Sequence, residues 1–194
     1  GPREVVAGAA AEPAPPCAAA DLPARPGHAP RARPVLRTPP PALIEGGAGE
    51  PERQLAALPR RAIADAALAD NGALVLTASV EEAVRVANAL APEHLELLVA
   101  DPRAWLPSVT SAGAVFLGSC TPEVVGDYVA GPNHVLPTGG TARFSSPLST
   151  EDFVKRSSII EYSPAGLAAA RPHLRTLTRL EGLAGHGLAA EVRE

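Results

Sequence analysis

The residues of this chain best suited to chemistry are histidines that stand near carboxylates in the sequence. Glu93 is followed directly by His94, Asp127 stands seven residues before His134, and Glu181 stands five residues before His186. A histidine with a near-neutral pKa can act as a general base or bind zinc, and a neighbouring carboxylate can orient it. Imidazole and carboxylate without thiolate form the ligand set of a catalytic zinc site. From the residues alone, each histidine can equally be a surface or hydrogen-bonded side chain, because no His-Glu-x-x-His motif is present.

The elements that must position these residues follow an alternating pattern. Residues 73–77 (ALVLT) form an apolar run of strand length introduced by the turn pair Asn71–Gly72. Ser79-Val-Glu-Glu82 matches a capping box and predicts a helix that ends near Leu90. Residues 114–117 (AVFL) predict a second buried strand. Strand, helix and strand at this spacing indicate a parallel α/β sheet.

The two ends of the chain differ in composition. Thirteen of the 22 prolines fall within residues 1–60, and residues 1–48 have the composition of a poorly ordered lead. Residues 50–69 have helical spacing that Pro59 kinks or splits. After Ser163–Pro164, a cap followed by proline at the first helical position, the chain is predicted to be helical towards its C-terminus.

Composition narrows the class of protein. The formal charge of -4 gives no reason to expect a nucleic acid or an anionic membrane as partner. No basic leader or 18-residue apolar run is present, so we expect a soluble, cytoplasmic protein. Cys17 and Cys120 have no CxxC spacing and are interpreted as ordinary small apolar residues. Residues 113–118 are not a Gly-x-Gly-x-x-Gly fingerprint for a dinucleotide.

Several blocks of sequence, in order and at matching separations, resemble one enzyme family. They are APEHLEL (91–97), SAGAVFLG (111–118), TPEVVGDYVAGPNHVLPT (121–138), EDFVKR (151–156) and EGLAGH (181–186). Together they resemble the C-terminal part of histidinol dehydrogenase, and the opening residues 1–5 are similar to that family's Gly-Pro-Ser-Glu-Val. The resemblance spans the chain, is strongest from about Glu50, and shows proline and arginine where a strand and helix are expected, as in residues 35–39.

The resemblance implies a reaction and two residues that carry it. Members of the family oxidise L-histidinol to L-histidine through an aldehyde, with two molecules of NAD and a bound zinc. Glu93 and His94 match the acid–base pair, with Glu93 activating water and His94 relaying protons. The alternative is that the pair merely follows Pro92 on an exposed turn.

The resemblance also implies a zinc site. Asp127, His186 and His28 match three ligands, whereas the position of the fourth, a glutamine in the family, holds Arg25. Arginine has no lone pair for a metal, and residues 26–27 (Pro-Gly) break the helical turn that would align positions 25 and 28. We therefore expect weakened zinc binding, unless a water or the substrate amine fills the gap.

Substrate contacts and the dimer follow from the same resemblance. His134 and Glu181 match contacts to histidinol, and His94, Asp127 and His186 lie with them in the implied substrate site. The family's substrate-contacting serine near the start is replaced by Arg3. In the family the tail reaches into the partner subunit, so we expect a homodimer that exchanges tails.

The fold expected from this resemblance is a partial Rossmann-like parallel sheet with helices, followed by a helical C-terminal tail. Its segments are the start of the α/β domain with the zinc-ligand region (1–48), the second half of that domain with the catalytic motifs (49–147), and a helical dimerisation tail (148–194). The family's NAD-binding residues lie in a preceding region to which nothing in this sequence corresponds.

Three functions stay open at this stage. The first is an NAD-dependent, zinc-containing histidinol dehydrogenase, represented by a fragment or a split gene product. The second is a truncated, inactive remnant that at most dimerises or binds a ligand. The third is a zinc hydrolase of another lineage, which would need ligands other than Asp127 and His186.

Overall fold

The structure, a computed structural model, describes residues 4–8, 32–38, 53–56 and 59–193. It divides into a first unit that ends at Asp152 and a second that begins at Phe153. We call the first the α/β unit and the second the tail. Among the described residues, no helix is long and apolar enough to cross a membrane.

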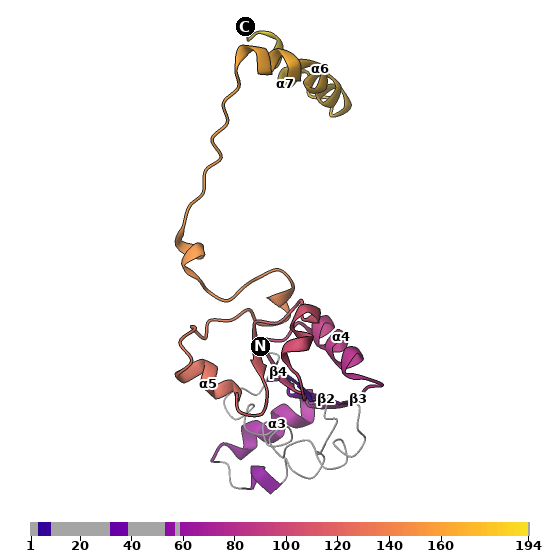
Figure 1. The fold of residues 1–194 in the computed structure, drawn as a ribbon, viewed down its shortest axis with the longest axis vertical. Coiled ribbons are helices and arrows are strands. Elements are labelled where there is room, and N and C mark those ends of the chain that lie inside the picture. Colours follow the sequence, from indigo (N-terminus) through magenta and orange to yellow (C-terminus); the bar gives the residue numbers. More distant parts are fainter. Residues whose placement is uncertain (1–3, 9–31, 39–52, 57–58, 194) are drawn as a thin grey trace. The chain divides into compact units, whose positions relative to one another are not determined.

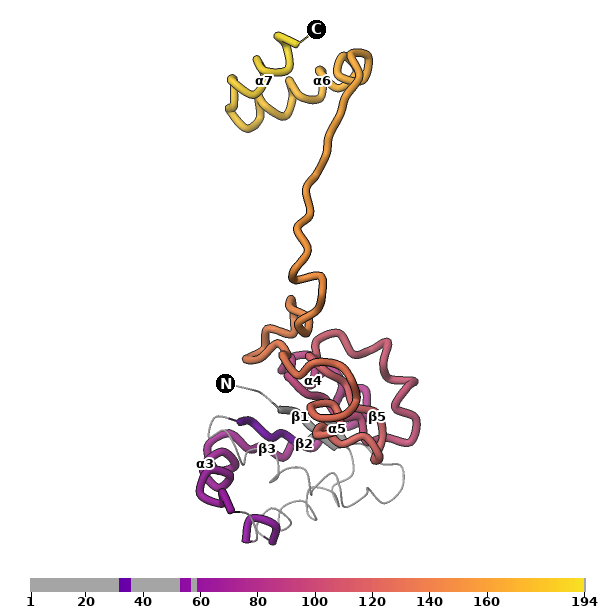
Figure 2. Tube along the Cα trace, turned by 90° about the vertical axis from the view of Figure 1, so that its left-hand side faces the viewer, coloured from indigo at the N-terminus to yellow at the C-terminus, as the bar shows by residue number. Residues whose placement is uncertain are grey.

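The α/β unit is built on one parallel sheet with the strand order β3-β2-β1-β4-β5. Figure 2 shows β2 and β3 side by side, with α3 (Arg61–Asn71) next to β3. The strands are β1 (Glu4–Gly8), β2 (Val35–Thr38), β3 (Ala73–Leu76), β4 (His94–Leu98) and β5 (Ala114–Leu117). This is the strand order of a doubly wound, Rossmann-like sheet. The Rossmann-like fold predicted from sequence is confirmed.

The strands β1 and β2 lie in the segment whose composition favoured an irregular lead. β1 pairs with β2 on one side and β4 on the other, so it is the central strand. β2 covers the stretch in which proline and arginine suggested that a strand had been lost, and it pairs in parallel with β3 over four residues. The compositional expectation was wrong at both strands, because pairing with neighbouring strands decides short segments more strongly than local propensity.

The core lies on one face of the sheet, beneath α4 (Val80–Leu90) and η2 (Arg103–Ser108). Its fully buried members come from β2, α4 and β4: Val35, Val84, Ala87, Leu95 and Leu97. Burying each of the larger side chains contributes about 1.5–3 kcal/mol. Consecutive side chains of a strand point to opposite faces of the sheet. Since Leu95 and Leu97 point into this core, His94 and Glu96 point to the opposite face.

The helix signals in the sequence are confirmed. At the start of α4, Ser79 Oγ accepts a hydrogen bond from the Glu82 N–H at 3.1 Å, and Glu82 Oε2 accepts one from the Ala78 N–H at 2.6 Å. The helix predicted over 50–69 is divided into a helical turn at 53–55 and α3 (Arg61–Asn71), with a turn at 59–60 before α3.

The opposite face of β4 is covered by α5 (Glu123–Tyr128), which follows β5 (Figure 1). No helix was predicted over these six residues. Two short 3-10 helices complete the unit, η3 (Thr141–Arg143) and η4 (Thr150–Phe153), the latter ending at the first residue of the tail.

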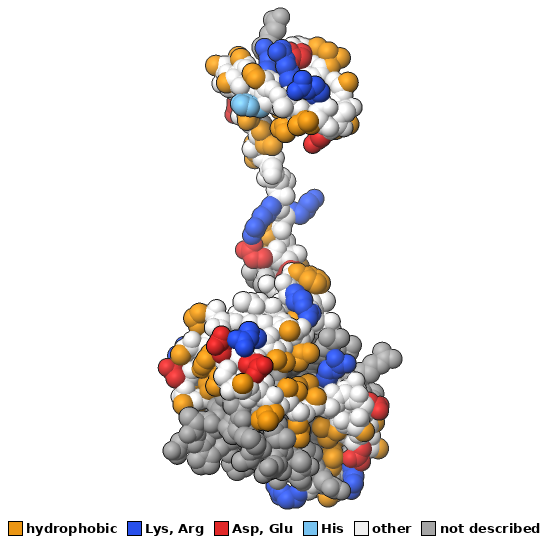
Figure 3. Space-filling view, turned by 90° about the vertical axis from the view of Figure 1, so that its right-hand side faces the viewer, with side chains coloured by type: hydrophobic (Ala, Val, Ile, Leu, Met, Phe, Trp, Pro, Cys, Tyr) orange, Lys and Arg blue, Asp and Glu red, His pale blue; other side chains and the backbone are white. Residues whose placement is uncertain are grey.

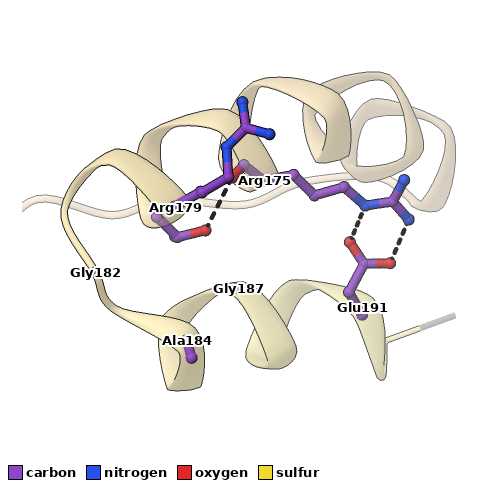
Figure 4. A pocket seen from close by; sticks show the side chains of 7 residues that line it. Arg175, Arg179, Gly182, Ala184, Gly187 and Glu191 are labelled. Carbon is purple, nitrogen blue, oxygen red and sulfur yellow. Dashed lines mark hydrogen bonds and ion pairs between the residues drawn. The ribbon is translucent and has the colours of Figure 1, made fainter.

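The tail is a pair of helices, α6 (Pro164–Leu180) and α7 (Ala184–Glu191) (Figure 4). Ser163 Oγ caps α6 by accepting a hydrogen bond from the Gly166 N–H at 3.1 Å, as predicted. Arg175 holds Glu191 through two hydrogen bonds of 2.5 and 2.6 Å, which lower the pKa of Glu191 and raise that of Arg175. No described residue of the tail is buried, so the helical pair has no core of its own.

A pocket of about 430 Å³ runs along the seam between the two tail helices (Figure 4). Its lining residues are Arg175, Thr178, Arg179, Gly182, Ala184, Gly187 and Glu191. A β-carbon on Gly187 would lie 3.0 Å from Thr178 Oγ1, so this glycine allows the close approach of the helices.

Candidate active site

The predicted acid–base pair lies where β4 begins. His94 is the first residue of the strand and only 4% exposed, and Glu93 immediately before it is half-buried. The Glu93 carbonyl accepts a hydrogen bond from the Ala114 N–H at 2.8 Å. A β-carbon on Gly113 would lie 2.6 Å from the same carbonyl, so glycine is required for β5 to begin beside the pair. The alternative of an exposed turn after Pro92 is wrong, because the pair opens an internal strand.

Two carboxylates from α5 face the His94 imidazole. Nε2 of His94 lies 3.5 Å from Oε1 of Glu123 and 3.9 Å from Oδ1 of Asp127. Glu123 and Asp127 are four residues apart and therefore share one face of the helix. Glu123 is 9% exposed, whereas the Asp127 side chain is 32% exposed. One carboxylate is thus buried against the imidazole, and the other reaches solvent.

Phe116 fixes the distance between α5 and the sheet. Its ring lies 5.9 Å from the His94 ring, with 42° between their planes. A β-carbon on Gly126 would lie 2.6 Å from Cε1 and 2.9 Å from Cζ of Phe116. Helix α5 can therefore approach β5 this closely only because residue 126 has no side chain.

A pocket of about 470 Å³ opens beside this group, over β5 and α5. Asp127, His134 and Phe116 are among its lining residues, and Asp127 Oδ1 lies 3.9 Å from Nε2 of His94. Aliphatic and proline side chains form much of the remaining wall: Val115, Val125, Leu136, Leu148, Pro132 and Pro147. An apolar pocket with a few polar groups on its wall is typical of a small-molecule site.

Asn133 shapes the loop that carries His134. Its Oδ1 accepts a hydrogen bond from the Val135 N–H at 2.9 Å, and its Nδ2 donates to the Leu148 carbonyl. The Leu148 N–H donates in turn to the Val135 carbonyl at 2.9 Å. His134 is exposed on a loop that is held from two sides.

The other predicted site residues belong to the tail or fall outside the described residues. Glu181 and His186 belong to the tail, where both are exposed, at the end of α6 and within α7 respectively. His28, Arg25 and Arg3 lie outside the described residues. Within the described part of the α/β unit, the structure brings together His94 and Asp127 and places His134 on the same pocket as Asp127.

Glu123 and Glu96 were not identified from the sequence. Glu96 is completely buried on β4, and its Oε1 accepts a hydrogen bond from the Glu123 backbone N–H at 3.0 Å. The four-residue interval between Glu123 and Asp127 was the available signal for Glu123. For Glu96 the signal was a carboxylate two residues after His94 in an apolar strand.

The donor set fits a metal ion. One ligand atom each from His94, Glu123 and Asp127 lie within 4.8 Å of one another. This group shares Asp127 with the ligands implied by resemblance. Carboxylate and imidazole donors are those of catalytic zinc sites.

Comparison with known proteins decides the lineage. The sequence profile described as histidinol dehydrogenase matches residues 1–194. The chain belongs to the histidinol dehydrogenase family. It is 51% identical over 193 residues to the histidinol dehydrogenase of Halalkalibacterium halodurans and 46% identical over 194 residues to that of Bacillus subtilis. These alignments cover 100% of this chain but 46% and 45% of the relatives, so the chain spans a little under half of their length.

The fold agrees with a solved structure of the same family. The crystal structure of histidinol dehydrogenase from Elizabethkingia anophelis matches with a TM-score of 0.82 and 34% sequence identity. The match covers 99% of this chain and 44% of that chain. The resemblance predicted from the sequence motifs is therefore confirmed, and a zinc hydrolase of another lineage is set aside. About 50% identity over the whole chain does not favour the inactive remnant.

Proposed function

We propose that this chain supplies the acid–base, metal-binding and substrate-binding part of an NAD-dependent L-histidinol dehydrogenase, which converts L-histidinol to L-histidine through L-histidinaldehyde. The observation that carries the proposal is the Glu93–His94 pair, with the imidazole 3.5 Å from Glu123 and 3.9 Å from Asp127 beside a pocket. We expect this reaction, the oxidation of a small soluble metabolite, to take place in the cytoplasm.

The chain's own residues would move protons in both oxidations. His94 takes the hydroxyl proton as hydride leaves the carbinol carbon, and the aldehyde forms. Glu93 then removes a proton from the water that attacks the aldehyde, and the protonated His94 returns its proton to the aldehyde oxygen, which gives the hydrate. As the second hydride passes to a second NAD, His94 takes a hydroxyl proton of the hydrate, and the acid product loses its remaining proton to water as the carboxylate. Glu123 would orient the His94 ring and stabilise its protonated form.

The complete enzyme would bind NAD mainly through residues outside the part that this chain spans. This chain has no Gly-x-Gly-x-x-Gly fingerprint, and the hydride acceptor would be held by the part of the relatives that this chain does not span. NAD therefore enters the proposal as a co-substrate of the complete enzyme.

Zinc would be held by Asp127 together with His28 and His186, and when bound it would anchor the polar groups of the substrate. His134 and Glu181 would contact histidinol, with the Glu181 carboxylate suited to its ammonium group. This assignment leaves His94 and Glu123 for proton transfer, because a metal on the imidazole would occupy the lone pair that a base needs.

In a homodimer, Glu181 and His186 of one chain's tail would reach the site around Asp127 of the other chain. The tail has no buried residue among those described, and its exposed apolar side chains include Leu177, Leu180, Leu188 and Val192. Figure 3 shows hydrophobic side chains on the surface of the tail. Exposed apolar side chains gathered on a surface can mark a contact with another protein chain. A second copy of the chain, receiving the tail beside its own Asp127, would complete the ligand set with His186 and Glu181.

The test measures zinc and L-histidinol binding to the purified chain by calorimetry. We expect both to bind, with zinc affinity lost in Asp127→Asn and His186→Gln but retained in His94→Gln. Asp101→Asn, on an exposed loop, is the matched control. Loss of zinc in His94→Gln with retention in His186→Gln would assign the metal to the His94 group instead.

Turnover is tested separately by co-expressing the chain with the complementary segment of the Halalkalibacterium halodurans relative. Histidinol-dependent NADH formation that disappears in His94→Gln is the expected result. A chain that binds neither zinc nor histidinol, and gives no NADH in that pairing, would refute the proposed function.

A further inference from the structure

Glu96 is a carboxylate in the middle of an internal strand. It is 0% exposed, between Leu95 and Leu97 of the core, and its side chain points to the face that α5 covers. Glutamate is almost never fully buried unless it is paired, because removing its charge from water is costly. We therefore expect the Glu96 carboxylate to make a specific hydrogen bond inside the protein.

This hydrogen bond is made with the backbone at the start of α5. This helix begins after Pro122, which makes no side-chain capping hydrogen bond. The Glu96 carboxylate supplies the cap from another element, because Oε1 accepts the Glu123 N–H at 3.0 Å. The helix has six residues, too few to be stable alone, and a negative charge at its amino end is favourable.

The capped helix is the one that carries both carboxylates facing His94. The backbone of Glu123 is fixed by Glu96, while the side chain of Glu123 lies 3.5 Å from His94 Nε2. Asp127 follows one turn later, 3.9 Å from the same nitrogen. A shift at the start of α5 would therefore displace both carboxylates together.

We propose that Glu96 is a positioning residue that sets the distance of Glu123 and Asp127 from His94 by capping α5. It acts through the helix backbone and touches neither substrate nor metal. This inference rests on the proposed function for the importance of that distance, but its geometry can be tested without metal or substrate.

Two substitutions separate positioning from a mere requirement for charge. Glu96→Gln keeps an acceptor oxygen at the same reach and removes the charge. Glu96→Asp keeps the charge but shortens the side chain, which moves the carboxylate away from the Glu123 N–H by about 1.5 Å, the length of one carbon–carbon bond. Positioning predicts that Gln preserves the site and Asp disturbs it, whereas a need for buried charge predicts the reverse.

The matched control is Glu82→Asp. Glu82 is also a carboxylate that accepts a backbone N–H at the start of a helix, but that helix is α4, on the opposite face of the sheet. If shortening any capping carboxylate disturbed the site through general loss of stability, Glu82→Asp would have the same effect as Glu96→Asp.

The first readout is the side-chain NMR signal of His94 in the metal-free chain, assigned by its loss in His94→Gln. We expect the signal to move in Glu96→Asp in the same direction as in Glu123→Gln, and to stay in place in Glu96→Gln and Glu82→Asp. The second readout is zinc affinity, which should fall about tenfold in Glu96→Asp and by less than about twofold in the other two.

The outcomes distinguish this inference from the proposed function. If the wild-type chain binds no zinc, the proposed metal site fails, but the His94 signal still decides the role of Glu96. An unmoved His94 signal in Glu96→Asp, or equal displacement in Glu96→Gln and Glu96→Asp, would overturn the positioning role. If Glu96→Asp does not fold, Glu96→Gln decides the question by itself. A displaced His94 signal in Glu96→Gln then refutes the positioning role, and an unchanged signal supports it.

Discussion

The contact between Gly126 and Phe116 gives a sharp test of how the site is spaced. The substitution Gly126→Ala places a carbon 2.6 Å from Cε1 and 2.9 Å from Cζ of the ring. Non-bonded carbon atoms settle at about 3.5–4.0 Å, so the contact must open by roughly 1 Å. Either the ring turns towards His94 or α5 moves away from the sheet.

The effect on the site should exceed the effect on stability. Overpacking costs about 1–3 kcal/mol, and replacing glycine within a helix returns about 1 kcal/mol, which leaves a net loss of about 0–2 kcal/mol. Functional groups, in contrast, must be held within about 0.5 Å of their working geometry. A movement of roughly 1 Å in Glu123 and Asp127 should therefore lower zinc affinity about tenfold or more.

The assay is a double-mutant cycle on zinc affinity, with urea unfolding measured in parallel. Phe116→Leu removes the two ring carbons that the new side chain meets, so the double variant should bind zinc more tightly than the sum of the single effects allows. Additive effects, or an unchanged zinc affinity in Gly126→Ala, would refute the steric reasoning.

Three further predictions concern other parts of the molecule. Asn133→Ala removes two hydrogen bonds that hold the His134 loop, each contributing about 1 kcal/mol, so histidinol affinity should fall about tenfold by calorimetry while zinc affinity is retained. Leu97→Ala empties a fully buried position and should lower the free energy of unfolding by about 2–5 kcal/mol in urea. Because the hydrogen bond from Arg175 lowers the pKa of Glu191, the unfolded chain holds more protons just below about pH 4.3, and the stability of the helical pair should decline as pH falls through the lowered pKa. Glu191→Gln should remove that part of the acid dependence, followed by far-ultraviolet circular dichroism.

Each of these predictions has an outcome that contradicts it. Equal losses of zinc and histidinol affinity in Asn133→Ala would mean that the loop supports the whole pocket rather than His134. A loss below about 1 kcal/mol in Leu97→Ala would contradict a well-packed core. An acid profile of Glu191→Gln identical to that of the unaltered chain would show that the ion pair with Arg175 does not stabilise the tail.

The sequence predicted those elements whose signals are local. Helix α4 has its cap in Ser79 and Glu82, α6 has Ser163–Pro164, and the runs that became β3 and β5 are apolar and bounded by glycine. β4 was not predicted, although Leu95 and Leu97 alternate with His94 and Glu96 as in a strand with one apolar face. The two polar side chains are buried only because α5 covers them, and this packing arises in the tertiary structure.

The candidate site could be located from motifs but not from the fold. Ligands of open α/β sheets usually bind beyond the carboxyl ends of the strands. Here His94 is the first residue of β4 and pairs with the first residues of β1 and β5, so the pair lies at the amino end of the sheet. The family motif identified Glu93, His94 and Asp127 directly, whereas Glu123 and Glu96 needed the packing of α5 on β4 to become visible.

Several carboxylates lie near the His94 imidazole, so this site should favour positively charged ligands. Glu93 precedes His94, Glu96 shares its face of β4, and Glu123 and Asp127 face it from α5. The amino end of α5 favours this negative charge only in part, because a six-residue helix has a small dipole. The proposed ligands, zinc and the ammonium group of histidinol, would both bring positive charge to the place where carboxylates are concentrated. A ligand that binds the folded state alone also stabilises it, so occupation of this site and folding of the short helix α5 should reinforce each other.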